Sequence, residues 1–210
     1  MPRIDDYKAS VALAVAALKE RWPREVAARS QSEWFAEGDQ EGLVVPYFGQ
    51  PRRVTWPEVT VAPVDQAGEL PLTEQILILH YLLNTGGDLP TGRTIDFRQV
   101  PSGSFYWSAF VSRAKTPLLQ TFGNDLELYL EVARRLGGEV LDLGDASASF
   151  KAFPLVTVTH VLWRGDAEFP PEGNILFDET ISQHLPTEDI AALAGASVYR
   201  LMGAARQMKK

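Results

Sequence analysis

The chain has 210 residues, with 20 Lys and Arg against 27 Asp and Glu, so its formal net charge is -7 at pH 7. A chain of this length can bury roughly 70% of its unfolded surface, and we expect one globular domain over residues 1–210. It has no cysteine. This excludes thiolate nucleophiles, zinc–thiolate sites and cysteine-held iron–sulfur clusters, because each needs sulfur as the reacting or ligating atom.

The acidic balance also argues against nucleic acid as a partner, since such binding draws on cationic side chains that displace counterions at phosphates. Residues 1–6 contain two acids where a secretory signal carries positive charge. The most apolar early stretch, residues 11–18, is far shorter than the ~20 residues that cross a bilayer. We therefore expect a soluble, cytoplasmic protein with no membrane partner.

The first predicted element is a helix over residues 6–36, which Pro23 divides in two. Its apolar stripe, with residues at helical spacing, consists of Val11, Val15, Leu18 and Trp22. Residues 42–61 then form short β-rich runs separated by turn residues, which predicts an antiparallel meander. Prolines cannot donate to a ladder, so we expect at least one of these strands to lie at a sheet edge or to end at its proline.

Later elements alternate between runs of helices and runs of strands. Helical spacing predicts helices over residues 72–85, 105–111, 124–136 and from 187 onward. Extended segments are predicted at residues 94–97, 139–143, 156–163 and 174–177. This order favours an α+β fold over a doubly wound sheet, with the meander and a mixed sheet packed against several helices.

Established catalytic motifs are missing from the sequence. There is no phosphate-binding P-loop, no dinucleotide-binding glycine pattern after a strand and no nucleophile elbow. The three histidines have no spacing that would bind zinc from one helix. His80 lies on the apolar stripe of its helix, where a core histidine is the simpler interpretation and a ligand-binding residue is the alternative.

Acidic side chains are concentrated after the strand that ends at Trp163. If residues 166–168 are extended, the carboxylates of Asp166 and Glu168 point to one face, as two oxygen ligands or a paired acid and base require. With Asp178 they form our candidate site for a divalent cation. The alternative is that these acids are solvated loop residues and helix caps.

A second candidate site combines Arg98 with the aromatic residues Tyr106 and Trp107. An arginine held by aromatic side chains can recognise a carboxylate or phosphate, although it can equally form a structural ion pair. Adjacent aromatic residues cannot share one helix face, so we expect one of them to be exposed to a ligand or partner. Trp163 and His80 complete the predicted ligand-binding set.

The sequence resembles an uncharacterised prokaryotic family, domain of unknown function 3786. The resemblance covers nearly the whole chain, and its residues are Leu79 to Leu83, Gly92 to Arg98, Pro101, Gly103, Tyr106, Phe122, Gly123, Leu162 to Pro170, Ile175 to Asp178 and Leu185 to Asp189. It implies an origin in anaerobic bacteria or archaea. Some longer relatives carry a cysteine-rich segment and are described as iron–sulfur proteins, whereas this chain has no cysteine to hold a cluster.

Three functions follow from these observations. The leading hypothesis is a small-ligand-binding or accessory domain, which the resemblance places in anaerobic metabolism. The alternative is a divalent-metal-dependent enzyme that uses Asp166, Glu168 and Asp178. The third is an interaction protein whose partner is another protein or, in a homo-oligomer, a second copy. The sequence leaves open which of the three is correct, whether the chain is an enzyme and which cofactor it uses.

Overall fold

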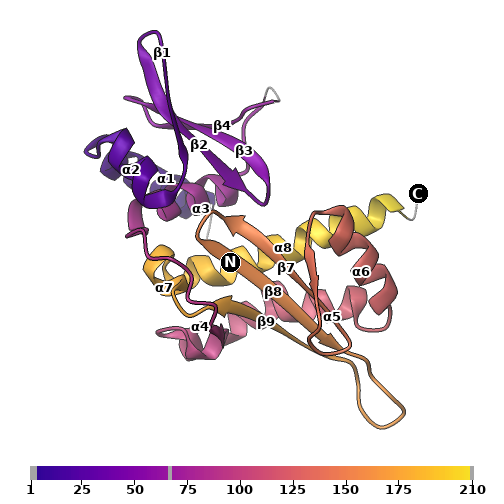
Figure 1. Cartoon of the computed structure of the whole chain (residues 1–210). Coiled ribbons are helices and arrows are strands. Elements are labelled where there is room, and N and C mark those ends of the chain that lie inside the picture. Colours follow the sequence, from indigo (N-terminus) through magenta and orange to yellow (C-terminus); the bar gives the residue numbers. More distant parts are fainter. Residues whose placement is uncertain (1–3, 66–67, 209–210) are drawn as a thin grey trace. The chain divides into compact units, whose positions relative to one another are not determined.

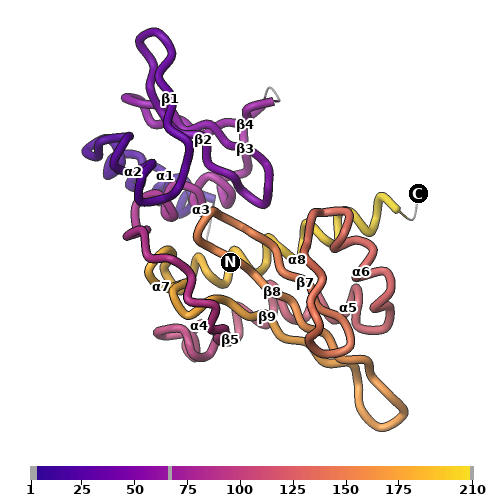
Figure 2. Tube along the Cα trace, in the orientation of Figure 1, coloured from indigo at the N-terminus to yellow at the C-terminus, as the bar shows by residue number. Residues whose placement is uncertain are grey.

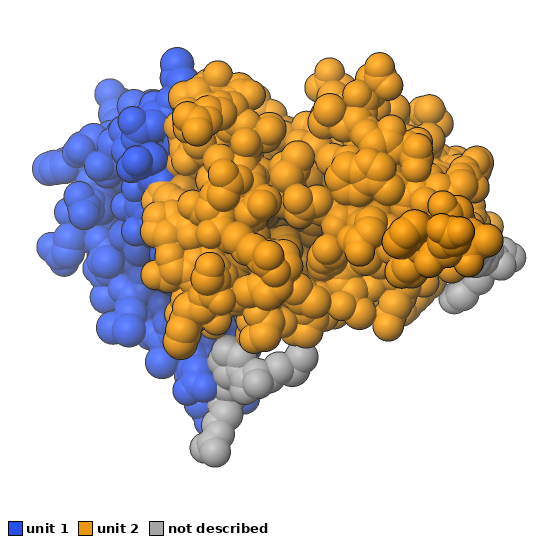
Figure 3. Space-filling model, turned by 90° about the horizontal axis from the view of Figure 1, so that it is seen from below, with its two compact units in different colours: residues 1–89, 153–155, 183–186 blue, residues 90–152, 156–182, 187–210 orange. Residues whose placement is uncertain are grey.

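The computed structural model describes residues 4–65 and 68–208, and its contacts divide the chain into two compact units (Figure 3). Unit 1 contains the described residues up to 89, together with 153–155 and 183–186; the rest form unit 2. Each unit has helices and an antiparallel sheet, which confirms the α+β class. That the whole chain folds as one domain stays a prediction.

Unit 1 is built on a four-stranded meander (Figure 1). Its strands are β1 (Glu33–Glu37), β2 (Gln40–Tyr47), β3 (Gln50–Trp56) and β4 (Thr60–Pro63), antiparallel and in sequence order. Its helices are α1 (Ile4–Lys19), α2 (Pro23–Ser30) and α3 (Leu72–Asn84). The predicted meander is confirmed, and β4 lies at a sheet edge and ends at its proline, as expected.

The N-terminal helical region differs from the prediction in two respects. Pro23 begins α2, so the predicted division is confirmed. Residues 33–37, however, form β1, because the left-handed conformation of Gln31 (φ 51°) ends α2 first. Trp22 does not continue the apolar stripe, because α1 already ends at Lys19. The side chain of Trp22 is 75% exposed.

Three side-chain contacts attach the meander to the helices of unit 1. The indole N–H of Trp56 in β3 donates to the carbonyl of Leu18 in α1 over 3.2 Å. Arg52, also in β3, forms a 2.6 Å ion pair with Glu74 in α3. The guanidinium of Arg24 in α2 lies 4.0 Å from the ring centroid of Trp34 in β1. Trp34, Arg52 and Trp56 lie on the same face of the sheet, so the helices cover that face.

Unit 2 contains the five-stranded sheet, in the order β5-β9-β8-β7-β6 (Figure 2). Its strands are β5 (Thr94–Asp96), β6 (Glu139–Leu141), β7 (Ala146–Phe153), β8 (Val156–Trp163) and β9 (Glu172–Asp178). Its helices are α4 (Gly103–Phe110), α5 (Thr116–Phe122), α6 (Leu126–Arg135) and α8 (Thr187–Met208), with a π-helical turn at Val111–Lys115 and the short α7 (Ile181–His184) shared with unit 1.

The core of unit 2 forms around α8, which lies behind the sheet in Figure 1. The predicted apolar face of α8 is buried, and its members are Ile190, Leu193, Ala194, Ser197 and Leu201. Pairs β5–β9, β8–β9 and β6–β7 are antiparallel, so the sheet that we expected to be mixed is antiparallel at these pairings. The sequence analysis did not predict β7, α5 or the π-helical turn. Within residues 4–65 and 68–208, no helix has both the length and the apolar character needed to cross a bilayer.

Candidate functional site

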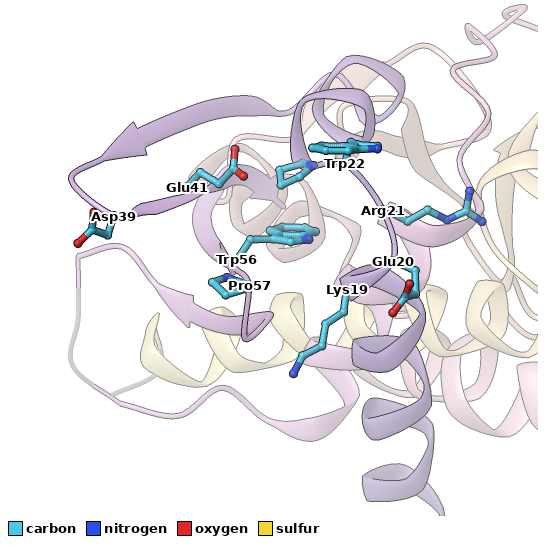
Figure 4. A pocket seen from close by; sticks show the side chains of 9 residues that line it. Lys19, Glu20, Arg21, Trp22, Asp39, Glu41, Trp56 and Pro57 are labelled. Carbon is cyan, nitrogen blue, oxygen red and sulfur yellow. The ribbon is translucent and has the colours of Figure 1, made fainter.

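A pocket of about 360 Å³ opens in unit 1 (Figure 4). It is lined by the connection between α1 and α2, the turn between β1 and β2, and the end of β3, with the side chains of Lys19, Glu20, Arg21, Trp22, Pro23, Asp39, Glu41, Trp56 and Pro57. Its volume falls in the range of small-molecule sites. All nine residues belong to unit 1, so the pocket is complete within one compact unit.

The inner wall of the pocket is set by strand register. Glu41 in β2 and Trp56 in β3 are directly opposed partners, so their side chains leave the same face of the sheet, with Cβ atoms about 5 Å apart. The indole N–H of Trp34 donates to Oε2 of Glu41 over 3.3 Å. Because this bond holds the carboxylate in place, Glu41 is fixed beside the ring of Trp56.

The outer wall is the indole of Trp22. This residue precedes Pro23 and adopts an extended conformation at the start of α2, with φ -75° and ψ 120°, as the residue before a proline usually does. Its side chain is 75% exposed, whereas that of Trp56 is 4% exposed. In Figure 4 both indoles are seen nearly edge-on, one above the other. One indole thus forms the floor of the pocket and the other stands in solvent.

Charged side chains of both signs surround the two indoles. Glu20, Asp39 and Glu41 line the pocket together with Lys19 and Arg21. In the part of the chain that the structure describes, none of these five side chains forms an ion pair. In Figure 4 the ends of Lys19 and Arg21 turn away from the indoles. Among these charges, the carboxylate of Glu41 is the one that strand register and the hydrogen bond from Trp34 hold beside an indole.

The sequence analysis missed this pocket, because it placed Trp22 in the apolar stripe of a helix and gave no role to Trp56. A signal was present: each of these two tryptophans is followed by proline, and the other three are not. The residue before a proline is biased away from helical conformation. Two Trp-Pro pairs therefore indicate two indoles held outside regular helix.

The predicted arginine–aromatic contact exists in unit 2. Cζ of Arg98 lies 4.1 Å from the ring centroid of Trp107. The backbone of Arg98 is fixed because Asp96 accepts hydrogen bonds from the N–H groups of Arg98 and Gln99 at 2.8 and 3.2 Å. A Cβ atom at Gly103 would lie 1.9 Å from the carbonyl oxygen of Phe97, so only glycine lets α4 begin this close to the arginine.

Tyr106 and Trp107 are both half-buried, so neither is the exposed aromatic residue that we expected. Tyr106 contacts Phe105 edge-to-face, with 5.2 Å between ring centroids, and Phe105 is 82% exposed. Arg98 is exposed and stacks on one ring, and no carboxylate pairs with it among the described residues. Trp163, at the end of β8, is 42% exposed, whereas His80 belongs to α3 of unit 1. The structure therefore brings Arg98 onto Trp107 and places His80 in the other unit.

The acidic candidates lie apart within unit 2. Asp166 and Glu168 are in the loop that joins β8 to β9, while Asp178 is the last residue of β9, six positions beyond Glu172. Six residues of strand span about 20 Å, so Asp178 and the loop acids do not share one ion. Within the described residues, no three His, Asp or Glu side chains are grouped as metal ligands. Nothing here supports the metal-dependent alternative.

Both aspartates instead accept structural hydrogen bonds. Asp166 accepts from the backbone N–H groups of Glu168 and Phe169, both at 2.8 Å, and these bonds hold the pKa of its carboxyl below the usual value. Asp178 accepts from Thr91, Gly92 and Thr180 at 2.7–3.2 Å. Burial alone would raise the pKa of Asp178, but these bonds together lower it. This geometry matches the alternative in which the acids stabilise loops.

The sequence model of the family described as domain of unknown function DUF3786 matches residues 23–200. The chain belongs to this family. The match confirms the resemblance drawn from the sequence, and it includes Glu41, Trp56 and all the predicted site residues. No curated protein and no solved structure matches the chain. Membership in DUF3786, a family described as of unknown function, therefore does not assign an activity.

Proposed function

We propose that the chain binds a small organic molecule in the pocket of unit 1. The observation that carries this proposal is the pair of indoles, one exposed at 75% and one buried beneath the same pocket. Leaving a large apolar side chain in water forgoes about 2 kcal/mol of burial free energy. A ligand that covers Trp22 recovers part of it, so an exposed indole beside a formed pocket favours a binding role.

The test is a screen of small neutral, anionic and cationic molecules against the full chain by ligand-observed NMR. Each hit is then titrated while the five tryptophan indole N–H resonances are followed, with the Trp22 resonance assigned from Trp22→Phe. We expect hits that shift the Trp22 resonance and bind at least about tenfold more weakly to Trp22→Ala. Tyr199→Ala, which removes a 55% exposed aromatic residue of unit 2, is the matched control. A screen in which no hit depends on Trp22 contradicts the proposal.

The exposed Arg98 guanidinium stacked on Trp107 favours a second candidate function, anion recognition. A planar guanidinium without an ion-pair partner can donate two parallel hydrogen bonds to a carboxylate. The test titrates oxalate against the wild-type chain, Arg98→Lys and Arg98→Met. We expect saturable binding that weakens in Arg98→Lys and disappears in Arg98→Met, because lysine keeps the charge and loses the fork. Equal binding to all three variants removes this candidate.

A protein partner or a second copy of the chain is also proposed as a way to cover exposed aromatic side chains. Phe105, Phe169 and Trp163 are 82%, 67% and 42% exposed. We also propose a cytoplasmic location and, from the resemblance alone, an accessory role in anaerobic metabolism. A mass in solution that rises with protein concentration supports self-association; a constant monomer mass leaves only a different protein as the partner.

A further inference from the structure

We infer that the ligand of the unit 1 pocket carries a quaternary ammonium group, held against the exposed face of Trp22, over the part of Trp56 that lines the pocket and beside the carboxylate of Glu41. This inference rests on the proposed function and adds the chemical class of the ligand. Trimethylammonium groups of this kind occur on choline, which is otherwise neutral, and on betaines, which also carry an anion. Both present the same headgroup to the pocket.

The first argument is that Trp56 offers a ligand only its ring. Its N–H donates to the carbonyl of Leu18 over 3.2 Å, so it is not available to a ligand. Trp56 is 4% exposed, so it presents only a small part of its ring to the pocket, and the open indole face is that of Trp22, which is 75% exposed. The face of an indole is the negative part of the ring quadrupole and attracts cations. A quaternary ammonium has no N–H to satisfy, so contact with a ring surface leaves none of its groups without a hydrogen bond.

The second argument is the carboxylate fixed beside this ring. Glu41 and Trp56 are directly opposed across β2 and β3, and the hydrogen bond from Trp34 holds the carboxylate in place at 3.3 Å. The negative charge and the π-face therefore point to the same side of the sheet. A cation that contacts both gains from each at once, and Glu41 does not have to move.

The third argument is that the same face of the sheet already holds a cation. Trp34 is the indole that donates to Glu41, and the guanidinium of Arg24 lies 4.0 Å from its ring centroid. On one side of Glu41 an indole is covered by a positive group from the protein. On the other side Trp56 and Trp22 line an open pocket, where a positive group from a ligand makes the equivalent contact.

The remaining charges are compatible with a small quaternary ammonium compound whose other end is either neutral, as in choline, or anionic, as in a betaine. Glu20 and Asp39 add negative charge at the rim, while Lys19 and Arg21 add positive charge and point away from the indoles in Figure 4. The positive ends therefore do not lie against the indoles. At the rim, Lys19 and Arg21 are the positive charges that can pair with the carboxylate of a betaine. Choline has no such carboxylate.

The experiment titrates the full chain by isothermal calorimetry with choline, glycine betaine and dimethylbutanol, the neutral analogue in which carbon replaces the quaternary nitrogen. We expect choline to bind at least about tenfold more tightly than dimethylbutanol, because the two have the same shape and differ in charge. Tighter binding of glycine betaine than of choline assigns the anionic end to Lys19 and Arg21. Equal binding of choline and dimethylbutanol overturns the inference.

Three variants separate the cation–π contact from apolar contact. Trp22→Leu keeps apolar bulk and loses the π-face, so we expect about fivefold weaker binding of choline, with most of the affinity kept in Trp22→Phe. Glu41→Gln removes the charge and keeps an oxygen for the Trp34 N–H, with about fivefold weaker binding expected. Glu37→Gln is the matched control, since Glu37 points to the opposite face of the sheet, where it pairs with Arg53. Affinity for choline that is unchanged in Trp22→Leu and Glu41→Gln contradicts the inference.

The two proposals fail in distinguishable ways. If neutral or anionic molecules shift the Trp22 resonance and choline does not, the pocket binds small molecules and the quaternary ammonium class is wrong. If neither choline nor any screened molecule depends on Trp22, the proposed function fails together with the ligand class. Circular dichroism of each variant, compared with the wild-type chain, checks that the substitution leaves the fold intact.

Discussion

The indole N–H of Trp56 donates to the carbonyl of Leu18 over 3.2 Å. This bond joins the last residue of β3 to the last turn of α1, and these two elements form adjacent walls of the pocket. The carbonyl of Leu18 also accepts from the backbone N–H of Arg21 at 2.9 Å, which positions the segment leading to Trp22. One carbonyl therefore connects both indoles of the proposed site to the same helix end.

The first prediction concerns this bond. Trp56→Phe keeps an aromatic ring but removes the buried N–H and leaves space where the larger ring was. We expect the free energy of unfolding, measured by urea denaturation, to fall by about 2 kcal/mol, because a buried hydrogen bond and packing are lost together. Trp163→Phe is the control, since this ring is 42% exposed and has little to lose. Equal losses in the two variants contradict the assigned role of the bond.

The second prediction concerns the ion pair that attaches β3 to α3. Arg52 and Glu74 lie 2.6 Å apart, with side chains 10% and 16% exposed, and Arg52 also donates to the side chain of Gln50 at 2.6 Å. Removing one charge leaves the other poorly solvated. We expect Arg52→Met to lower the free energy of unfolding by about 3 kcal/mol, and Arg52→Met with Glu74→Leu to lower it by less than the sum of the single changes.

The matched control is the pair between Arg164 and Glu127 in unit 2. Its atoms are equally close, at 2.7 Å, but both side chains are more than half exposed. Water and salt screen such a pair, so the same double-mutant cycle should give a much smaller coupling free energy. A coupling at Arg52 and Glu74 no larger than the one at Arg164 and Glu127 means that burial does not strengthen the first pair.

Local sequence patterns predicted most elements because each pattern acts within a few residues. The stripe of α8, the Pro23 break and the meander all follow from spacing and turn residues. Other features depend on distant contacts. The pocket needs the register that opposes Glu41 to Trp56. The three acids of the predicted cation site do not lie together, because the length of β9 separates Asp178 from Asp166. Strand pairing, rather than propensity, decided which side chains meet.

The third prediction concerns Asp178 and Asp166, the two aspartates of the candidate cation site. Asp178→Asn should lower the free energy of unfolding by about 2 kcal/mol, because the carboxylate accepts hydrogen bonds from Thr91, Gly92 and Thr180. Its folded pKa lies below the ordinary value, so this stabilisation is present above about pH 4 and is lost as the pH falls further. Asp166→Asn, in the exposed loop, should change stability little. A stabilised Asp178→Asn contradicts this role.

The last prediction concerns His160, which is fully buried in β8 against α8. Oγ of Ser197 donates to the carbonyl of Ala194 at 2.7 Å, so at 2.9 Å it accepts the proton of Nε2 of His160. Nδ1 has no hydrogen-bond partner among the described residues, which fixes the neutral tautomer protonated at Nε2. Burial lowers the pKa of His160 from 6.5 to about 3.

This shift makes folding depend on pH. Below about pH 6.5 the unfolded chain binds a proton at His160, whereas the folded chain leaves His160 neutral down to about pH 3. The free energy of unfolding therefore falls by up to about 1.4 kcal/mol for each pH unit between these two values. His160→Gln keeps an N–H donor for Ser197 and cannot titrate, so its stability should decline less over pH 6.5 to 4.5. The measurement is urea denaturation of both proteins across this range, with the ring of His160 followed by NMR. A ring that titrates near 6.5 in the folded chain, or equal slopes in both proteins, contradicts the assigned tautomer and its burial.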